Sequence, residues 1–270
     1  MRTLRDEAVV LRTHKLGEAD RIVTVLTREN GRMRGVAKGV RRTSSKFGAR
    51  LEPFMHVDLQ FWHGRTLDVI TQADTVVPYA RSIIGNYPRY TAASAMVETV
   101  ERLTPDEREP ATQQFLLLVG ALRTLARGDH ESGLVLDAFL LRSLATAGWA
   151  PSFDDCARCG GPGPHRAFSV QSGGVVCPLC RPPGSTAPAP DTLTLLGALL
   201  SGDWAHADGS EHVHRAEASS LVTAFLEWHV ERGVRALRMV ERADPTPERR
   251  HPQGHSGPAR DRSPGLVTRA

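Results

Sequence analysis

The four cysteines of the chain form two pairs with the spacing of a metal site. Cys156 and Cys159 make one Cys-x-x-Cys pair, Cys177 and Cys180 make the other, and 17 residues separate the two pairs. Four thiolates at this spacing offer zinc the tetrahedral sulfur shell of a zinc ribbon. Because four sulfur ligands leave no position for a reacting water, the pattern predicts one structural Zn²⁺ per chain. A pair of thiol or disulfide motifs without a metal is the alternative.

Arginine and lysine are concentrated near the amino terminus. Residues 1–50 carry 13 of them against 5 acidic residues, whereas the rest of the chain has a net negative charge. Clustered cations gain free energy when they displace condensed counterions from a polyanion, so this segment predicts a nucleic-acid partner. A solvated basic surface without any partner is the alternative interpretation.

Short β-like segments must position these basic residues. Val, Ile, Leu, Thr and Phe recur between turn residues throughout residues 7–77, which is typical of strands. Asn30-Gly31 joins the second and third segments and favours the tight turn of a hairpin. The predicted strands cover residues 8–13, 21–28, 32–40, 55–62 and 66–73. Five strands in about 70 residues predict a small closed or half-closed barrel.

The third predicted strand alternates basic and small side chains. Its basic face would hold Arg32, Arg34, Val36 and Lys38, because successive side chains of a strand point to opposite faces. The polar stretch that follows carries further cations. In the five-stranded barrel called the OB-fold, single strands lie across strands two and three, between the first and fourth loops. The residues predicted to contact nucleic acid there are Arg21, Arg32, Arg34, Lys38, Arg41, Arg42, Lys46 and Arg50.

Aromatic residues near this surface could stack on bases. Phe47 sits within the basic stretch and is a candidate for stacking, which contributes roughly 1–3 kcal/mol per base. Phe54, Phe61 and Trp62 are predicted to belong to the core. Phe61 and Trp62 are adjacent in a strand and therefore must point to opposite faces.

Helical periodicity replaces the strand pattern beyond Pro78. The predicted helices cover residues 90–103, 111–127, 131–147, 192–201 and 215–240. The sequence thus predicts an α+β fold: an N-terminal OB-fold barrel (1–80), then a helical domain (81–242) with a zinc ribbon inserted at 153–183. Residues 243–270 are rich in Pro, Gly, Arg and His and are predicted to be disordered.

Several enzyme classes and a membrane location are excluded by what the sequence lacks. None of the three lysines, Lys15, Lys38 and Lys46, precedes the Ser or Thr of a P-loop or begins the Lys-x-Asp-Gly motif of a DNA ligase. The longest uncharged apolar run, residues 115–122, is much shorter than the ~20 residues that cross a bilayer. The charged amino terminus does not resemble a signal peptide. A cytoplasmic protein without a catalytic site is expected, and its cysteine usage agrees with a reducing compartment.

Taken in order along residues 1–242, the motifs resemble the RecO family of bacterial recombination mediators. The motifs are Gly17-Glu18-x-Asp20, Val36-Ala37-Lys38-Gly39, Leu51-Glu52-Pro53-Phe54, the two Cys-x-x-Cys pairs, Phe225-Leu226-Glu227-Trp228-His229 and Leu237-Arg238. In the family the basic OB surface contacts DNA, and Lys38, Arg41 and Arg42 occupy the matching positions. Some members of the family lack the cysteines, so the resemblance implies that zinc has a scaffolding role.

The resemblance also implies an activity, partners and a nucleoid-associated location. Members bind single-stranded and duplex DNA, anneal complementary strands without ATP, and cooperate with RecR to load RecA onto strands coated by single-strand-binding protein. They can also grip the acidic, apolar tail of single-strand-binding protein with the helical domain. The cations available there are Arg102, Arg123, Arg127 and Arg142. An RNA-binding OB-fold protein with a zinc ribbon, and a nuclease or ligase, are the alternative functions.

Overall fold

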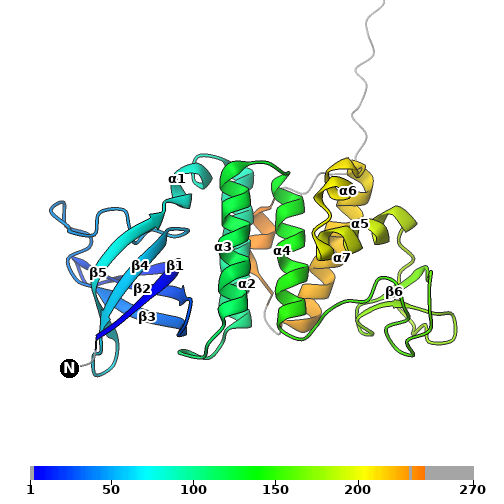
Figure 1. Ribbon diagram of the computed structural model, residues 1–270, viewed down its shortest axis with the longest axis horizontal. Helices are drawn as coiled ribbons and strands as arrows, with labels where there is room; N and C mark the ends of the chain where they lie inside the picture. The colour runs from blue at the N-terminus through cyan, green and yellow to red at the C-terminus, as the bar shows by residue number, and fades with distance from the viewer. Residues whose placement is uncertain (1–2, 231–232, 241–270) are drawn as a thin grey trace, which may run out of the picture.

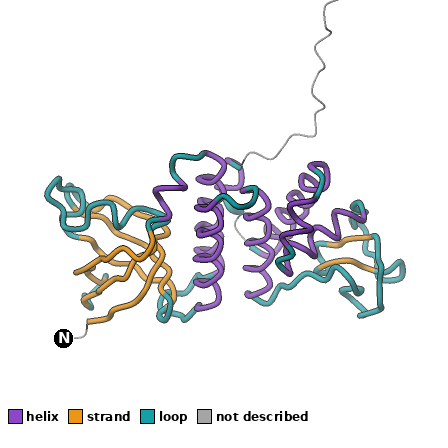
Figure 2. Tube along the Cα trace, turned by 45° about the horizontal axis from the view of Figure 1, so that its top comes forward, coloured by secondary structure: helices purple, strands orange, loops and turns teal. Residues whose placement is uncertain are grey.

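The computed structural model describes residues 3–230 and 233–240. A β-barrel lies at one end, helices fill the middle, and a small two-stranded ribbon lies at the other end (Figures 1 and 2). This arrangement is the predicted α+β architecture. The tail predicted for residues 243–270 lies outside the described residues.

The barrel contains five strands and is closed. The strands are β1 (Thr3–Leu16), β2 (Asp20–Thr27), β3 (Gly31–Ala37), β4 (His56–Trp62) and β5 (Asp68–Val77). They follow the order β1-β2-β3-β5-β4, and the long β1 pairs with both β2 and β4. Every pairing is antiparallel except that of β3 with β5. This topology confirms the predicted OB-fold.

Alternation along β3 places small side chains inside the barrel. Met33, Gly35 and Ala37 are buried, whereas Arg34 between them is exposed. A Cβ added at Gly35 would lie 2.8 Å from a side-chain carbon of Ile70, so the barrel interior requires glycine at that position. β3 ends at Ala37, and Lys38 therefore lies in the turn that follows rather than on the predicted basic face of the strand.

Helices form the rest of the molecule. They are α1 (Tyr79–Ile83), α2 (Tyr87–Leu103), α3 (Thr112–Arg127), α4 (Ser132–Thr146), α5 (Pro190–Ser201), α6 (Trp204–Gly209), α7 (His212–His229) and the 3₁₀ helix η1 (Arg235–Met239). The predicted helix over 215–240 is wrong in extent, because Val230 takes an extended conformation that ends α7. The short α1 and α6 were not predicted. No helix among the described residues is long and apolar enough to cross a membrane.

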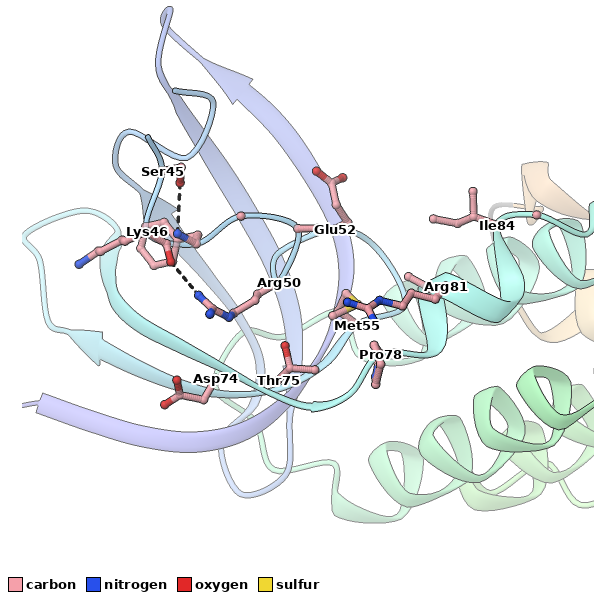
Figure 3. A pocket seen from close by; sticks show the side chains of 15 residues that line it. Ser45, Lys46, Arg50, Glu52, Met55, Asp74, Thr75, Pro78, Arg81 and Ile84 are labelled. Carbon is pink, nitrogen blue, oxygen red and sulfur yellow. Dashed lines mark hydrogen bonds between the residues drawn. The ribbon is translucent and has the colours of Figure 1, made fainter. Parts of the chain in front are cut away.

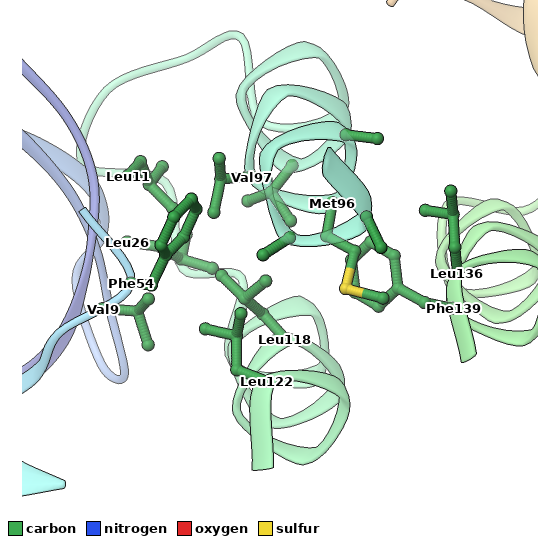
Figure 4. Packing of buried hydrophobic residues seen from close by; sticks show 14 of the residues in the cluster. Val9, Leu11, Leu26, Phe54, Met96, Val97, Leu118, Leu122, Leu136 and Phe139 are labelled. Carbon is green, nitrogen blue, oxygen red and sulfur yellow. The ribbon is translucent and has the colours of Figure 1, made fainter. Parts of the chain in front are cut away.

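One continuous hydrophobic core joins the barrel to the helices. Leu11, Leu26 and Phe54 of the barrel face Val97 of α2 and Leu118 of α3 (Figure 4). Farther from the barrel, Met96 of α2 meets Leu136 and Phe139 of α4 (Figure 4). Full burial of such a side chain contributes about 1.5–3 kcal/mol. The barrel is therefore held firmly against α2 and α3.

The loop between α2 and α3, residues 104–111, also attaches the helices to the barrel. The Arg108 N–H donates to the carbonyl of Arg32 at 2.9 Å, and the Arg108 guanidinium contacts the buried Asp68 carboxylate at 2.5 Å. Gly31 has a φ of +64°, and a Cβ there would lie 1.7 Å from the carbonyl oxygen of Glu109. The Asn30-Gly31 turn thus needs glycine both for its conformation and for the close approach of this loop.

Replacing Gly31 with alanine tests that close approach. Gly31→Ala adds a steric clash with backbone to the positive-φ strain, so the free energy of unfolding should fall by about 2 kcal/mol or more. Gly17→Ala is the matched control, because Gly17 has a φ of +57° with nothing within 4 Å of the new Cβ. The free energy of unfolding of the control should fall by only about 1–2 kcal/mol. Urea denaturation measures both variants. Equal losses in the two variants would contradict the role assigned to loop 104–111.

Candidate nucleic-acid interface and metal centre

Residues 38–50, here called the basic loop, follow β3 and are anchored to the turn between β1 and β2. The Gly39 N–H donates to Asp20 Oδ1 at 2.7 Å, and the Arg41 N–H donates to the Ala19 carbonyl at 3.0 Å. The Arg41 side chain donates to the carbonyls of Glu18 at 2.7 Å and Gly17 at 3.3 Å. These contacts fix the position of the loop beside the first loop of the barrel.

The far half of the basic loop is anchored by burial. Phe47 is only 2 % exposed, and Leu51, which follows the loop, is 1 % exposed. The prediction that Phe47 stacks on bases is therefore wrong, because its ring faces the interior. Lys46 lies over the Phe47 ring, 5.1 Å from the centroid, and donates to the Thr71 carbonyl at 2.7 Å. Arg50 donates back to the Lys46 carbonyl at 2.7 Å.

Three cations of the basic loop reach into solvent beside the first loop. Lys38, Arg41 and Arg42 are exposed. Within residues 3–230 and 233–240, the side chains of Lys38 and Arg42 make no hydrogen bond or ion pair. Arg21 of the neighbouring β2 pairs with Glu52 at 2.7 Å. A phosphate could therefore bind Lys38 and Arg42 without breaking an internal contact.

The two arginines of β3 have protein partners instead. Arg34 Nε lies 2.5 Å from the Glu107 carboxylate, and Arg32 donates to the Pro105 carbonyl. Both partners belong to loop 104–111. The structure thus separates the predicted DNA-contacting residues into two groups. Arg21 and the basic loop lie beside the first loop, whereas Arg32 and Arg34 lie against the helical part.

Two residues near the barrel surface differ from the expectations: Arg81 was not predicted to line a site, and Trp62 was predicted to belong to the core. Arg81 of α1 lines a cavity of about 1040 Å³ that α1 shares with the basic loop (Figure 3). Its helix is only five residues long and gave no periodic signal. Trp62 is 45 % exposed, so its predicted place in the core is wrong, whereas its neighbour Phe61 is buried as predicted. The opposite orientations of these two neighbours confirm the alternation that the sequence predicted.

The four cysteines come together in the ribbon formed by β6 (Ala167–Ser169) and β7 (Gly174–Val176). Their four sulfur atoms lie within 4.8 Å of one another. Cys159 Sγ and Cys177 Sγ are 3.9 Å apart, far beyond the ~2.05 Å of a disulfide. A tetrahedral site with metal–sulfur bonds of about 2.3 Å has sulfur–sulfur edges of about 3.8 Å. The cluster therefore fits one metal ion.

The electrostatics of the cluster also fit a cation. Backbone hydrogen bonds, that of the Cys177 N–H first, lower the pKa of Cys156 to about 6. Hydrogen bonds with the neighbouring thiols of Cys177 and Cys159 raise the pKa of Cys180 to about 12. One thiolate thus forms readily, whereas four thiolates so close together repel one another. A divalent metal ion removes this repulsion and lets all four deprotonate.

Aromatic packing joins the ribbon to the helices. The Phe168 ring of β6 stacks on Phe153 at 6.2 Å and meets the Phe225 ring of α7 edge-on at 6.4 Å. The metal cluster and the basic loop lie at opposite ends of the molecule (Figure 1). A metal ion in the ribbon consequently has no contact with the basic loop and would act by holding residues 153–183 in shape.

Comparison with known proteins identifies the relatives of this chain. Residues 1–79 match the family model described as "Recombination protein O N terminal", and residues 85–238 match "Recombination protein O C terminal". Proteins named DNA repair protein RecO from Streptomyces griseus and Streptomyces coelicolor are each 62 % identical over 248 residues, which is 90 % of this chain and all of each relative. The same-named protein of Thermobifida fusca is 59 % identical over 243 residues, again 90 % of this chain and all of the relative.

Both parts of the fold are thus matched in order, and the matches cover the barrel as well as the helices that carry the ribbon. The relatives' name supports a role in DNA repair and recombination. The chain belongs to the RecO family.

Proposed function

We propose that this chain binds single-stranded and duplex DNA through the basic loop and anneals complementary strands without ATP. The observation that carries the proposal is the exposure of Lys38, Arg41 and Arg42 on a loop whose backbone is fixed beside the first loop of an OB-fold barrel. A loop whose backbone is already fixed loses little backbone entropy when its side chains bind phosphate. The family membership supports a nucleic-acid role for this surface.

Electrostatics accounts for annealing on such a surface. Two DNA strands repel each other through their phosphates, and a basic surface that holds them lowers this repulsion while it raises their local concentration. Base pairing then supplies the free energy of the reaction. No nucleotide hydrolysis is required, which agrees with the absence of a P-loop motif from the sequence. In this proposal the protein has no catalytic site.

The proposed partners are RecR and the tail of single-strand-binding protein, with RecA acting downstream at the nucleoid in the cytoplasm. Internal contacts reduce the number of arginines in the helical part that are free to bind an acidic tail. Arg142 donates to the carbonyls of Leu199 and Leu200, and Arg102 pairs with Glu98 at 3.4 Å. Arg123 and Arg127 of α3 are exposed and are therefore the better candidates.

The metal proposed for the ribbon is zinc in a structural role. Four sulfur donors in tetrahedral array suit Zn²⁺ and exclude an open coordination position. The cysteines would hold the two knuckles together and so keep Phe168 packed on α7.

An annealing assay tests the function. Complementary fluorescent strands precoated with single-strand-binding protein are mixed with the full-length protein in the absence of ATP. We expect pairing well above the rate without protein, and competition by single-stranded RNA weaker than by single-stranded DNA. No acceleration on either coated or bare strands, or equal competition by RNA, would contradict the proposal.

A double charge reversal tests the surface. Lys38→Glu/Arg42→Glu removes two phosphate contacts without breaking an internal one, so the affinity for both DNA forms should fall at least about tenfold, and the salt slope should decrease by roughly 1–2. Fluorescence anisotropy across a salt series measures both effects. Arg158→Glu/Arg166→Glu in the ribbon is the control, with the same charge change at the other end of the molecule. Unchanged DNA affinity of the basic-loop variant would contradict the assignment of DNA binding to the basic loop.

Metal content tests the ribbon. Protein purified without chelator should contain about one zinc per chain by elemental analysis, and Cys159→Ser should contain little, because a hydroxyl is a poor fourth ligand. The variant should melt at a lower temperature yet retain most DNA affinity, since the basic loop is remote from the metal. Wild-type protein without zinc, or a variant that keeps full zinc occupancy, would refute the site.

A further inference from the structure

A groove separates the basic loop from α1 and the end of β5. It encloses about 1040 Å³ and is lined on one side by Lys46 and Arg50, and on the other by Arg81 and Ile84 (Figure 3). We call it the α1 groove. It begins where the basic loop turns back toward the barrel, so it continues the surface to which we assign DNA binding.

Positive charge predominates on the walls of the α1 groove. Arg50 lines it from the basic loop, with its guanidinium turned toward the Lys46 carbonyl, and Arg81 extends from α1 (Figure 3). In the part of the chain that the structure describes, the Arg81 guanidinium has no hydrogen-bond or ion-pair partner. Of the two acidic groups, Glu52 is already neutralised by Arg21 at 2.7 Å, and Asp74 accepts a hydrogen bond from Gln72 at 2.6 Å. An anion entering the groove therefore meets more unpaired positive than negative charge.

The α1 groove also has an apolar lining. Met55, Pro78 and Ala80 contribute to it, together with Ile84, which is 56 % exposed. An exposed isoleucine beside the unpaired Arg81 guanidinium suits a ligand that carries both apolar surface and negative charge. Burying the apolar surface of Ile84 adds to the binding free energy in proportion to the area covered.

Single-stranded DNA offers that combination, and duplex DNA does not. In a single strand the bases can turn away from one another and place their faces on protein side chains while the phosphates meet cations. In a duplex the base faces are stacked inside the helix, and only phosphates and base edges remain accessible.

We infer that the α1 groove binds a short stretch of single-stranded DNA that continues from the basic loop, with phosphates on Arg50 and Arg81 and bases against Pro78 and Ile84. The inference rests on the proposed function and deepens it: the basic loop binds both DNA forms, and the α1 groove gives preference to the single strand. Asp74 of β5 also lines the α1 groove, and its negative charge opposes phosphate entry.

Removal of the Arg81 charge tests the inference. Arg81→Ala should weaken binding of a labelled oligothymidylate of about 20 nucleotides roughly five- to tenfold at low salt, and binding of a duplex of the same length less than about twofold. Arg166→Ala, an exposed arginine in the ribbon, is the matched control and should change neither affinity. An Arg81→Ala variant that binds both forms like the wild type, or that loses affinity equally for both, overturns the inference.

A second variant gives a gain that misfolding could not produce. Asp74→Asn keeps the size and the Gln72 contact while it removes a negative charge from the wall, so oligothymidylate should bind about two- to fivefold tighter. Failure of this gain overturns the placement of phosphate in the α1 groove.

Failure of the proposed function gives a different pattern. If Lys38→Glu/Arg42→Glu leaves both affinities unchanged, DNA does not bind the basic loop. If that variant weakens binding of both forms and Arg81→Ala does not discriminate between them, only the α1 groove is excluded.

Discussion

Burial of Phe47 and Leu51 beneath the basic loop is the constraint on which the proposed interface depends. Like-charged side chains repel, and a loop with five cations among thirteen residues would spread them apart if nothing held its backbone. Two buried side chains hold the far half of the loop, while Arg41 and Gly39 hold the near half against the first turn of the barrel. Backbone hydrogen bonds between Val10 and residues 54–55 continue this anchoring where the chain leaves the loop. The repulsion between the cations is thereby opposed before any ligand arrives.

The outer face of β3 contacts the helical part of the molecule. Arg32 and Arg34 point outward, as strand alternation requires, but loop 104–111 pairs them with a carbonyl and a carboxylate. The arginines of this face thus bind the protein's own helical part. Exposed cations without acidic partners among the described residues lie instead on the basic loop and on α1. For this reason we place the proposed DNA surface beside the first loop of the barrel.

Regular patterns in the sequence were sufficient to predict the barrel and the metal cluster. Period-two alternation identified the strands and the opposite orientations of Phe61 and Trp62, and the two Cys-x-x-Cys pairs identified the sulfur cluster, because both depend on local spacing. The burial of Phe47 and the partners of Arg32 and Arg34 depend on segments distant in sequence, such as loop 104–111. Arg81 could not be predicted to line the α1 groove, because its five-residue helix is too short to show a hydrophobic period. The family resemblance added the order of the domains but could not supply these contacts.

The shared core and loop 104–111 together oppose independent motion of the barrel relative to α2 and α3. A hinge needs a linker with few contacts across it, whereas here side chains from β1, β2 and the segment before β4 interlock with two helices, and Arg108 reaches a buried carboxylate of β5. The contacts therefore favour one arrangement of the barrel against these helices. In the proposed function, a protein bound to the helices would then be held near a strand bound to the barrel in an orientation that the folded chain itself sets.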